Sequence, residues 1–329
     1  MIIYVTKKTS PFYTLAMEEL LLKDESIKED IMYFYQHDNA IIIGKNQNIY
    51  EEVKLDVVEK EKIEVYRRLS GGGAVYHDLG NINFSFITKK ENNNYEKFLT
   101  PIIEFFQSLD LDARFKGRND LVVNGAKVSG NAQIVYKNRM VHHGTILFDA
   151  NLSKLSEVLI PNKLKIESKG IKSIRQRVTN ILSELDFKMY HDEFIEKLIS
   201  FFEKKYQSKR QELPSKYDKE LKELGEFKKS KEWVYGKNPS FSFKIQAKTD
   251  GGILKILANI ENNKIYDIAF EGDFLSQKPV EEIYHLFIDQ EFSKANIGRI
   301  LDSIELEHYF GAIKKEEIIA LFFGELGGE

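Results

Sequence analysis

Two arginines and three glycines form the stretch of this sequence with the clearest chemistry. Arg67 and Arg68 precede Ser70, and residues 71–73 are all glycine. Glycine loses more backbone freedom on folding than any other residue, so three in a row are expected where the backbone must approach something closely. Amides of a glycine-rich loop can converge on a phosphate or carboxylate, and guanidinium groups favour such an anion. The plainer interpretation is a surface turn between two strands.

This loop differs from the common nucleotide-binding loops. The sequence has no Gly-x-x-x-x-Gly-Lys-Ser/Thr motif, which a Walker loop requires. A dinucleotide fingerprint needs glycines that open a helix, whereas these glycines lead into a stretch that predicts a strand. The loop therefore predicts an anion site of another kind.

A second candidate site surrounds the turn Asn124-Gly125. Asn-Gly is a strong signal for a two-residue hairpin, which would bring Asp120 close to Lys127 on the neighbouring strand. One interpretation is a cross-strand ion pair worth about 0.5 kcal/mol. The other is a ligand site, because the small residues Ser129 and Gly130 leave room and a lysine ammonium suits a place between a carboxylate and a phosphate.

Two further segments carry histidines or clustered positive charge. His142-His143-Gly144 lacks the additional ligands that a metal site needs, and no His-Glu-x-x-His motif occurs, so structural or substrate-positioning roles are favoured. The basic segment from Lys169 to Asn180 is either a solvated surface or part of a loop, residues 163–180, that closes over phosphates.

Hydrophobic periodicity predicts the elements that would position these residues. In the first 150 residues it indicates strands at 2–5, 31–36, 40–43, 63–67 and 81–87 and helices at 11–24, 51–62 and 95–109, followed by two hairpins that turn at 124–125 and 137–138. A mixed sheet with helices fits this order better than alternating βαβ units. Further helices are expected at 152–159, 191–206 and 216–226.

The composition changes near residue 246. A hairpin at 253–260 and 265–270 is then followed by helices near 280–292 and 314–323, which predicts a small α+β unit. The expected domains are therefore residues 1–246, which hold the candidate site, and residues 247–329.

Composition limits the class of protein. The 329 residues are enough for two domains, and 42% hydrophobic with 30% charged residues is globular composition. A net charge of -3 gives no global basic field for nucleic acid, and no apolar run approaches the ~18 residues of a membrane span. The absence of cysteine excludes disulfides, thiolate metal sites and a cysteine nucleophile. Without a signal-peptide pattern at the N-terminus, a cytoplasmic protein is expected.

Taken together, residues 67–86, 117–133, 142–147 and 169–180 resemble the lipoate–protein ligases, ATP-dependent enzymes of the biotin/lipoyl ligase fold. The most specific features are Ser-Gly-Gly-Gly-Ala-Val-Tyr-His-Asp at 70–78 and Lys-Val-Ser-Gly-Asn-Ala at 127–132. The similarity extends over nearly the whole chain. It implies an α+β protein in which a mixed-sheet catalytic domain, residues 1–246, precedes a small α+β accessory domain, residues 247–329.

The resemblance also implies an activity. Members of this family activate lipoate with ATP to lipoyl-AMP and pyrophosphate, then transfer the lipoyl group to a lysine of an acceptor. The implied acceptors are the lipoyl domains of 2-oxoacid dehydrogenase E2 subunits and the glycine cleavage H protein. Mg²⁺ is expected with ATP, because the polyphosphate charge must be offset. A monomer that binds neither nucleic acid nor membrane is expected.

Site residues follow from the family motifs. Lys127 matches the lysine that contacts both the acyl carboxyl group and the phosphate, and Asp120 is expected to orient it or to hold Mg²⁺. The implied ATP-binding residues are Arg68, Gly73, Ala74, Val75, Tyr76 and Lys127. The implied lipoate-binding residues are Arg68, Ser70, Gly72, Val75, His77, Lys127 and His143. The implied adenylate-binding loop contains Lys169, Gly170, Arg175, Arg177 and Val178.

Several alternatives stay open. The base that deprotonates the acceptor lysine could be His77, Asp120 or His143, or proximity to the adenylate could suffice. Related octanoyltransferases and lipoyl amidotransferases use a cysteine thioester, which this chain cannot form. The Gly-Arg-Gly-Arg-type loop of biotin ligases is absent. A non-catalytic lipoyl-binding homologue is the remaining alternative.

Overall fold

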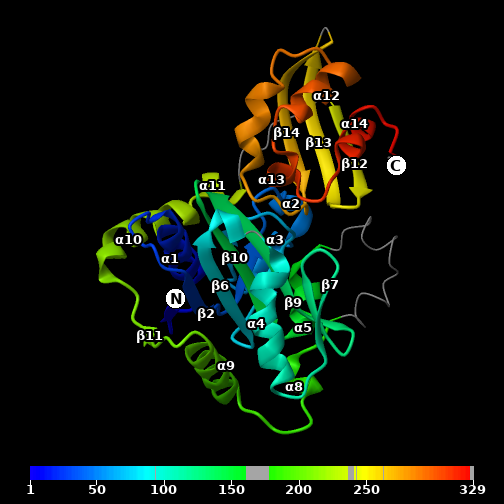
Figure 1. Ribbon diagram of the computed structural model, residues 1–329. Helices are drawn as coiled ribbons and strands as arrows, with labels where there is room; N and C mark the ends of the chain where they lie inside the picture. Colours follow the sequence, from blue (N-terminus) through cyan, green and yellow to red (C-terminus); the bar gives the residue numbers. More distant parts are fainter. Residues whose placement is uncertain (93, 161–177, 236–240, 242, 262, 327–329) are drawn as a thin grey trace.

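A computed structural model describes the chain except for residues 93, 161–177, 236–240, 242, 262 and 327–329 (Figure 1). Its largest element is a mixed sheet of eight strands in the order β11-β1-β2-β6-β10-β9-β8-β7. β1 pairs in parallel with both β2 and β11, and the remaining neighbours are antiparallel. The strands are β1 (Ile2–Val5), β2 (Ile31–Gln36), β6 (Asn81–Lys89), β7 (Ala113–Lys116), β8 (Asp120–Val123), β9 (Ala126–Tyr136), β10 (Arg139–Leu147) and β11 (Arg210–Gln211).

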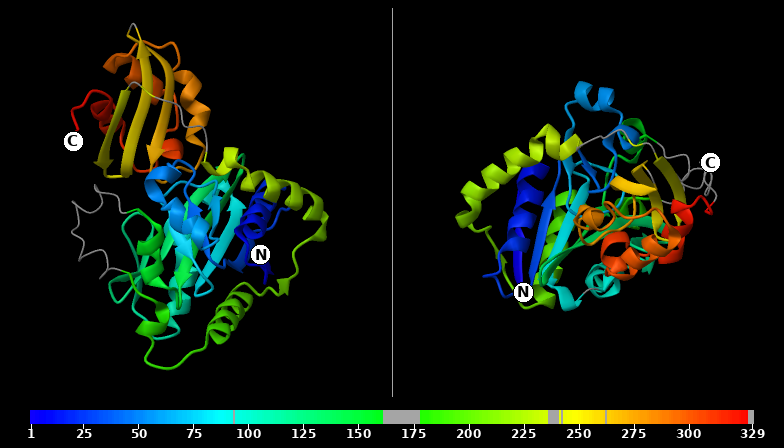
Figure 2. Two further views of the ribbon diagram at one scale, coloured as in Figure 1. Left: turned by 180° about the vertical axis from the view of Figure 1, so that it is seen from behind. Right: turned by 90° about the horizontal axis from the view of Figure 1, so that it is seen from above.

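Side chains that alternate along these strands divide the sheet into two buried faces. In β2, Phe34 belongs to a core that includes α4 (Tyr95–Gln107) and α9 (His191–Lys205). Tyr33 and Tyr35 belong to the opposite core, with α1 (Pro11–Lys23) and α10 (Asp218–Lys229). Figures 1 and 2 show the sheet between these two helical layers. The strands predicted for this sheet and the helices predicted at 11–24, 95–109, 152–159, 191–206 and 216–226 are confirmed, apart from shifts of a few residues at their ends. The helix predicted near 280–292 is instead a 3-10 helix over 280–286.

A second sheet, of three strands in the order β4-β3-β5, carries the glycine loop. It consists of β3 (Ala40–Ile43), β4 (Glu64–Arg67) and β5 (Val75–His77). Beside it lie α2 (Ile49–Glu52), α3 (Leu55–Lys60) and α5 (Leu152–Val158). The single helix predicted over 51–62 is wrong, because Val53 forms a β-bridge with Leu159 and the Lys54 amide donates to the Val158 carbonyl at 2.9 Å, which separates α2 from α3.

The C-terminal part has its own sheet and its own core. β12 (Phe243–Thr249), β13 (Gly252–Glu261) and β14 (Lys264–Gly272) are antiparallel, and η3 (Val280–Leu286), α12 (Lys294–Asp302), α13 (Leu306–Phe310) and α14 (Lys315–Phe322) accompany them. β12 was not predicted, and it crosses the expected boundary after residue 246. Figures 1 and 2 show this domain at one end of the larger part of the molecule.

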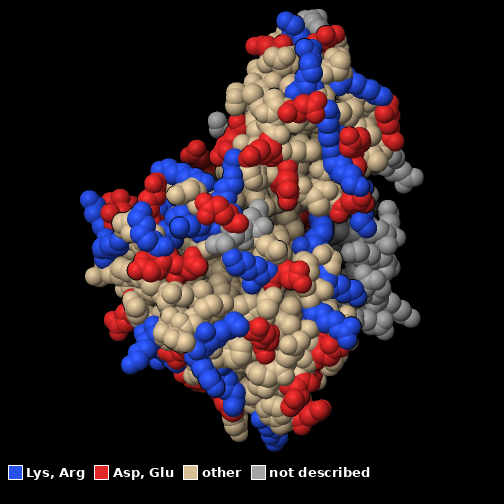
Figure 3. All heavy atoms as spheres, viewed as in Figure 1, with Lys and Arg blue, Asp and Glu red and all other residues tan. Residues whose placement is uncertain are grey.

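The remaining described elements are short: η1 (Lys90–Asn92), α8 (Ile181–Glu184), η2 (Ser215–Tyr217) and α11 (Lys231–Tyr235). Acidic and basic side chains are interspersed over the face drawn in Figure 3, as the small net charge suggests. None of the described helices combines the length and the apolar character needed to cross a membrane.

Candidate active site

Asp120 and Lys127 meet across the hairpin of β8 and β9. Asn124 and Gly125 have φ values of 50° and 85°, the left-handed conformation that a tight Asn-Gly turn uses. Lys127 Nζ lies 2.6 Å from Asp120 Oδ1, and the two side chains are 36% and 37% exposed. The predicted approach of these residues is confirmed. Because both groups stay accessible to solvent, the ion pair itself adds little stability, and the ammonium can still reach a ligand.

Lys127 is also joined to the end of the basic segment. The Thr179 amide donates to the Lys127 carbonyl at 3.0 Å, and Val178 forms a parallel bridge with Lys127. Val178 is the one residue of the expected adenylate-binding loop within the described part of the chain. Lys169, Gly170, Arg175 and Arg177 lie outside the described residues. A side chain in place of Gly130 would put its Cβ 3.3 Å from Lys127 Nζ, so Gly130 keeps space for the ammonium.

Arg68 determines the shape of the glycine loop. Its guanidinium donates to the carbonyl oxygens of Ile42, Gly71 and Gly73 and to Ser70 Oγ, at 2.7–3.2 Å. Burial lowers the pKa of Arg68 to about 10, so it remains charged at neutral pH. Arg68 therefore holds the loop closed upon itself. Its expected contact with a nucleotide phosphate stays a prediction.

Two loop amides contact the C-terminal domain instead of converging on one point. The Gly72 amide donates to the Phe274 carbonyl at 3.0 Å, and the Gly71 amide donates to the Ser276 carbonyl at 3.3 Å. Gly71 must be glycine here, because a Cβ would lie 2.4 Å from the Phe274 oxygen. The close backbone approach predicted from the glycines is confirmed, but in this conformation the approaching group is a peptide backbone and not an anion.

Arg67 is a structural residue. It is buried, and its guanidinium donates to the carbonyl oxygens of Gly44, Lys45, Gln47 and Val234. The expectation that both neighbouring arginines face an anion is therefore wrong for Arg67. Arg67 is the last residue of β4 and Arg68 follows it, and of the two only Arg68 donates to carbonyl oxygens of the glycine loop.

His143 links the glycine loop to helix α1. Its Nε2 lies 2.7 Å from Ser70 Oγ, and its Nδ1 lies 3.1 Å from both carboxylate oxygens of Glu18. The Ser85 hydroxyl also donates to Glu18. Ser70 and His143, both expected in the lipoate site, are thus brought together. Among the described residues, no group of three potential ligands could hold a metal ion.

Glu18 is the site residue that sequence reasoning missed. It was assigned to the helix at 11–24 without a function. Nine residues of α1 are buried, and Glu18 and Glu19 are two of them. Two adjacent carboxylates in such an apolar helix were the available signal, since a buried carboxylate needs a partner.

His142 is a core residue. It lies on the opposite face of β10 from His143, fully buried, with its ring 5.0 Å from that of Phe98. Burial, helped by the neighbouring His143, lowers the pKa of His142 well below its ordinary value. The structural role favoured for this residue is consistent with that position.

The side chains of strand β5 alternate between the two faces of the small sheet. Val75 packs into the core that contains Tyr35, whereas Ala74 and Tyr76 pack on the other side of the small sheet. Because adjacent strand residues point to opposite faces, Val75 and Tyr76 do not line one slot together. The phenol of Tyr76 instead donates to Asn39 Oδ1 at 3.1 Å.

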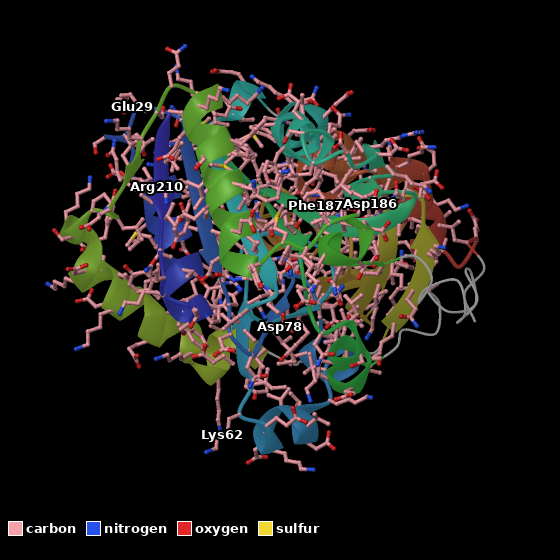
Figure 4. The ribbon with its side chains drawn as sticks, turned by 90° about the horizontal axis from the view of Figure 1, so that it is seen from below. Glu29, Lys62, Asp78, Asp186, Phe187 and Arg210 are labelled. Atoms are coloured by element: carbon pink, nitrogen blue, oxygen red, sulfur yellow. The ribbon has the colours of Figure 1, made fainter. Side chains whose placement is uncertain are left out.

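His77 lies on the same face of β5 as Val75 and is 5% exposed. Its Nδ1 lies 3.0 Å from His37 Nδ1, and the two rings stack. Burial and the nearby charge of Arg68 lower the pKa of His77 to about 3. Asp78, labelled in Figure 4, follows His77 and fixes the next turn by accepting the amides of Gly80 and Asn151. His77 is therefore a neutral, firmly held imidazole near Arg68.

Two family models match the two parts of the chain. Residues 10–203 match the lipoyl protein ligase A/B catalytic domain, and residues 238–322 match the bacterial lipoate protein ligase C-terminus. Together these matches define a two-domain acyl-group ligase. The chain belongs to the lipoate–protein ligase family.

Known proteins resemble the chain over nearly its whole length. It is 39% identical over 320 residues to lipoate-protein ligase LplJ of Bacillus subtilis (strain 168), an alignment that covers 95% of this chain and 97% of that protein. The crystal structure of P. falciparum LipL1 in complex with lipoate has a TM-score of 0.82 and 26% identity, covering 97% and 98% of the two chains. A lipoate-protein ligase A bound with ATP has a TM-score of 0.61 and 28% identity, covering 71% of this chain and 98% of its own.

Proposed function

We propose that this lipoate–protein ligase works through an acyl-adenylate. A lipoate carboxylate oxygen attacks the α-phosphorus of ATP, the bond to the bridging oxygen breaks, and pyrophosphate leaves. The amine of an acceptor lysine then attacks the acyl carbon, the acyl–oxygen bond breaks, AMP leaves and the amine gives up a proton. The ATP-bound relative supports the use of ATP.

The accessible ammonium of Lys127 is the observation that carries this proposal. The first step brings two anions together, so positioning and charge neutralisation are the main tasks of the protein. Lys127 Nζ lies 2.6 Å from Asp120 Oδ1, and the Lys127 side chain as a whole is 36% exposed. An ammonium that is oriented on one side and accessible on the other can contact both the carboxylate and the α-phosphate.

Asp120 fits the expected Mg²⁺ only as a single carboxylate. Mg²⁺ in nucleotide sites keeps water ligands and needs one or two carboxylates beside the substrate phosphates, so one aspartate at the Lys127 pair is compatible with it. Bound there, Mg²⁺ would offset the charge of the polyphosphate. The steps assigned to Lys127 do not depend on this contact.

The candidate bases for the second step are no longer equivalent. A pKa of about 3 leaves His77 a weak proton acceptor at neutral pH. His143 has both ring nitrogens engaged, by Ser70 and Glu18. Asp120 is committed to Lys127. We therefore infer that the acceptor amine is deprotonated without a dedicated base, because the adenylate provides a good leaving group close to it.

The experiment is to incubate the protein with ATP, lipoate and each candidate acceptor, and to weigh the acceptors by mass spectrometry. The candidates are the E2 lipoyl domain of a 2-oxoacid dehydrogenase and the glycine cleavage H protein. A lipoyl mass increase that requires ATP supports the proposal. Lipoate binding without any transfer or ATP consumption would instead favour a non-catalytic lipoyl-binding protein.

A further inference from the structure

A row of hydrogen bonds leads from the start of helix α1 to His77. Thr14 Oγ1 lies 3.3 Å from the Ser10 carbonyl oxygen and 2.8 Å from His37 Nε2. His37 Nδ1 lies 3.0 Å from His77 Nδ1. Thr14, His37 and His77 are all buried, and among the described residues none pairs with His77 Nε2. The row therefore begins at a carbonyl, which can only accept, and ends at one ring nitrogen.

Only two arrangements of protons fit this row when both rings are neutral. In the first, the Thr14 hydroxyl donates to the Ser10 carbonyl, His37 Nε2–H donates to Thr14, and His77 Nδ1–H donates to His37 Nδ1. Three hydrogen bonds form, and His77 Nε2 carries a lone pair. In the second, Thr14 donates to His37 Nε2 and His37 Nδ1–H donates to His77. Two hydrogen bonds form, and His77 Nε2–H is left as a buried donor.

The number of hydrogen bonds favours the first arrangement. It satisfies one more hydrogen bond, and it leaves an acceptor instead of a donor without a partner, which is the less rare outcome in folded proteins. Arg68 stands near His77, and its positive charge opposes proton binding there, as does the adjacent His143. That effect keeps the His77 ring neutral, as both arrangements require.

We propose that Thr14 and His37 are positioning residues that lock His77 in the Nδ1–H tautomer, so that its buried Nε2 is a permanent hydrogen-bond acceptor for a ligand that reaches it. The atom suits an O–H or N–H donor, either an ordered water molecule or the amine of the acceptor lysine. His77 is then a fixed acceptor and not a proton carrier. The tautomer does not depend on the proposed function; only the choice of the acceptor-lysine amine as a ligand rests on it.

The tautomer can be read without any ligand by nitrogen NMR of the ¹⁵N-histidine-labelled protein. The chain has seven histidines, and His77→Gln identifies the His77 signals by removing them. We expect Nδ1 of His77 to be protonated and Nε2 unprotonated in the wild type. Thr14→Val removes the hydroxyl, so the His77 signals should shift toward a mixture of tautomers. Thr14→Ser keeps the hydroxyl and should retain the wild-type signals.

A protonated Nε2 in the wild type, or identical His77 tautomers in wild type and Thr14→Val, would overturn the proposal. Because these readouts need no activity, they stay distinct from a failure of the proposed reaction. Thr14→Val should also lower the rate of the reaction step that uses the His77 Nε2 hydrogen bond by about tenfold, and Thr14→Ser should retain the wild-type rate. A lower rate of lipoate-dependent ATP–pyrophosphate exchange would indicate that Nε2 binds an ordered water molecule. A lower rate of lipoyl transfer alone would indicate that Nε2 binds the amine of the acceptor lysine. No loss in either, despite a changed tautomer, would overturn the assigned role of the acceptor.

Discussion

Lys228 of α10 and Glu19 of α1 form a buried ion pair near strand β4, which leads into the glycine loop. This pair offers a quantitative test of how the strand is supported. Their side chains are 2% and 5% exposed, and Lys228 Nζ lies 2.8 Å from Glu19 Oε2. The same ammonium lies 3.5 Å from the centroid of the Trp233 ring, and Trp233 Nε1 donates to the Arg67 carbonyl. Replacement of Lys228 by methionine keeps a long side chain but leaves the Glu19 carboxylate with less compensation.

The structure gives the size of the effect. Breaking a buried ion pair by removing one partner costs about 3–5 kcal/mol. Glu19 keeps a second ammonium, Lys23 Nζ at 2.5 Å, so the expected loss is at the lower end, about 3 kcal/mol. At about 2–4 °C per kcal/mol for a domain of this size, the melting temperature should fall by roughly 6–12 °C. The double replacement Glu19→Met with Lys228→Met removes both charges and should recover most of the loss.

Tryptophan fluorescence reports on this region specifically, because Trp233 is the single tryptophan of the chain. Urea unfolding followed by its fluorescence would give the free energy of unfolding from the midpoint and slope. Lys229→Met is the matched control, since Lys229 pairs with Glu226 at the surface, and it should change stability by less than about 0.5 kcal/mol. A loss below about 1 kcal/mol for Lys228→Met, similar to the control, would refute the reasoning.

Three further predictions concern pH and the C-terminal domain. Burial lowers the pKa values of His37 and His77, so unfolding takes up protons below about pH 6.5. The free energy of unfolding should therefore decrease as pH falls toward 3, by up to about 1.4 kcal/mol per pH unit for each histidine. His77→Gln should reduce that slope in acid unfolding titrations, and an unchanged slope would contradict the buried neutral pair. Gly71→Ala should displace the C-terminal domain, because the added Cβ would lie 2.5 Å from the Ser276 nitrogen, and small-angle scattering should then give a larger radius of gyration. Gly298→Ala is the control, because its added Cβ would make only ordinary contacts of 3.7 Å and more. Equal radii of gyration for the two variants would count against this contact. The C-terminal domain is also predicted to rotate between the two half-reactions, and the same domain angle in crystals of the apo and adenylate-bound protein would oppose that prediction.

Contacts between residues close together in the chain could be predicted from the sequence. The Asn124-Gly125 turn sets the register of its hairpin, and the pairing of Asp120 with Lys127 follows from it. Ser10-Pro11 marks the start of α1, although the Ser10 hydroxyl donates to Glu64 at 3.0 Å instead of capping the helix.

Contacts between distant segments were not readable. The partners of the Gly71 and Gly72 amides come from residues more than 200 positions away, and nothing in the loop itself encodes them. Glu18, a partner of His143, belongs to α1, and His37, the partner of His77, directly follows β2; periodicity predicted the two elements but not these contacts. β12 was missed although Gly236 and Asn238-Pro239 are turn residues before it, because its pairing with β13 depends on the fold of the whole C-terminal domain.

The most direct test of the central claim is lipoate-dependent ATP–pyrophosphate exchange by the Lys127→Ala variant. Lys116→Ala is the matched control, because Lys116 lies opposite Asp120 on the neighbouring strand β7 and is also exposed. If Lys127 brings the carboxylate and the α-phosphate together, exchange should fall by about 10²–10³-fold in Lys127→Ala, with an unchanged melting temperature, while Lys116→Ala stays near wild type. Exchange in Lys127→Ala close to the wild-type rate would contradict the account.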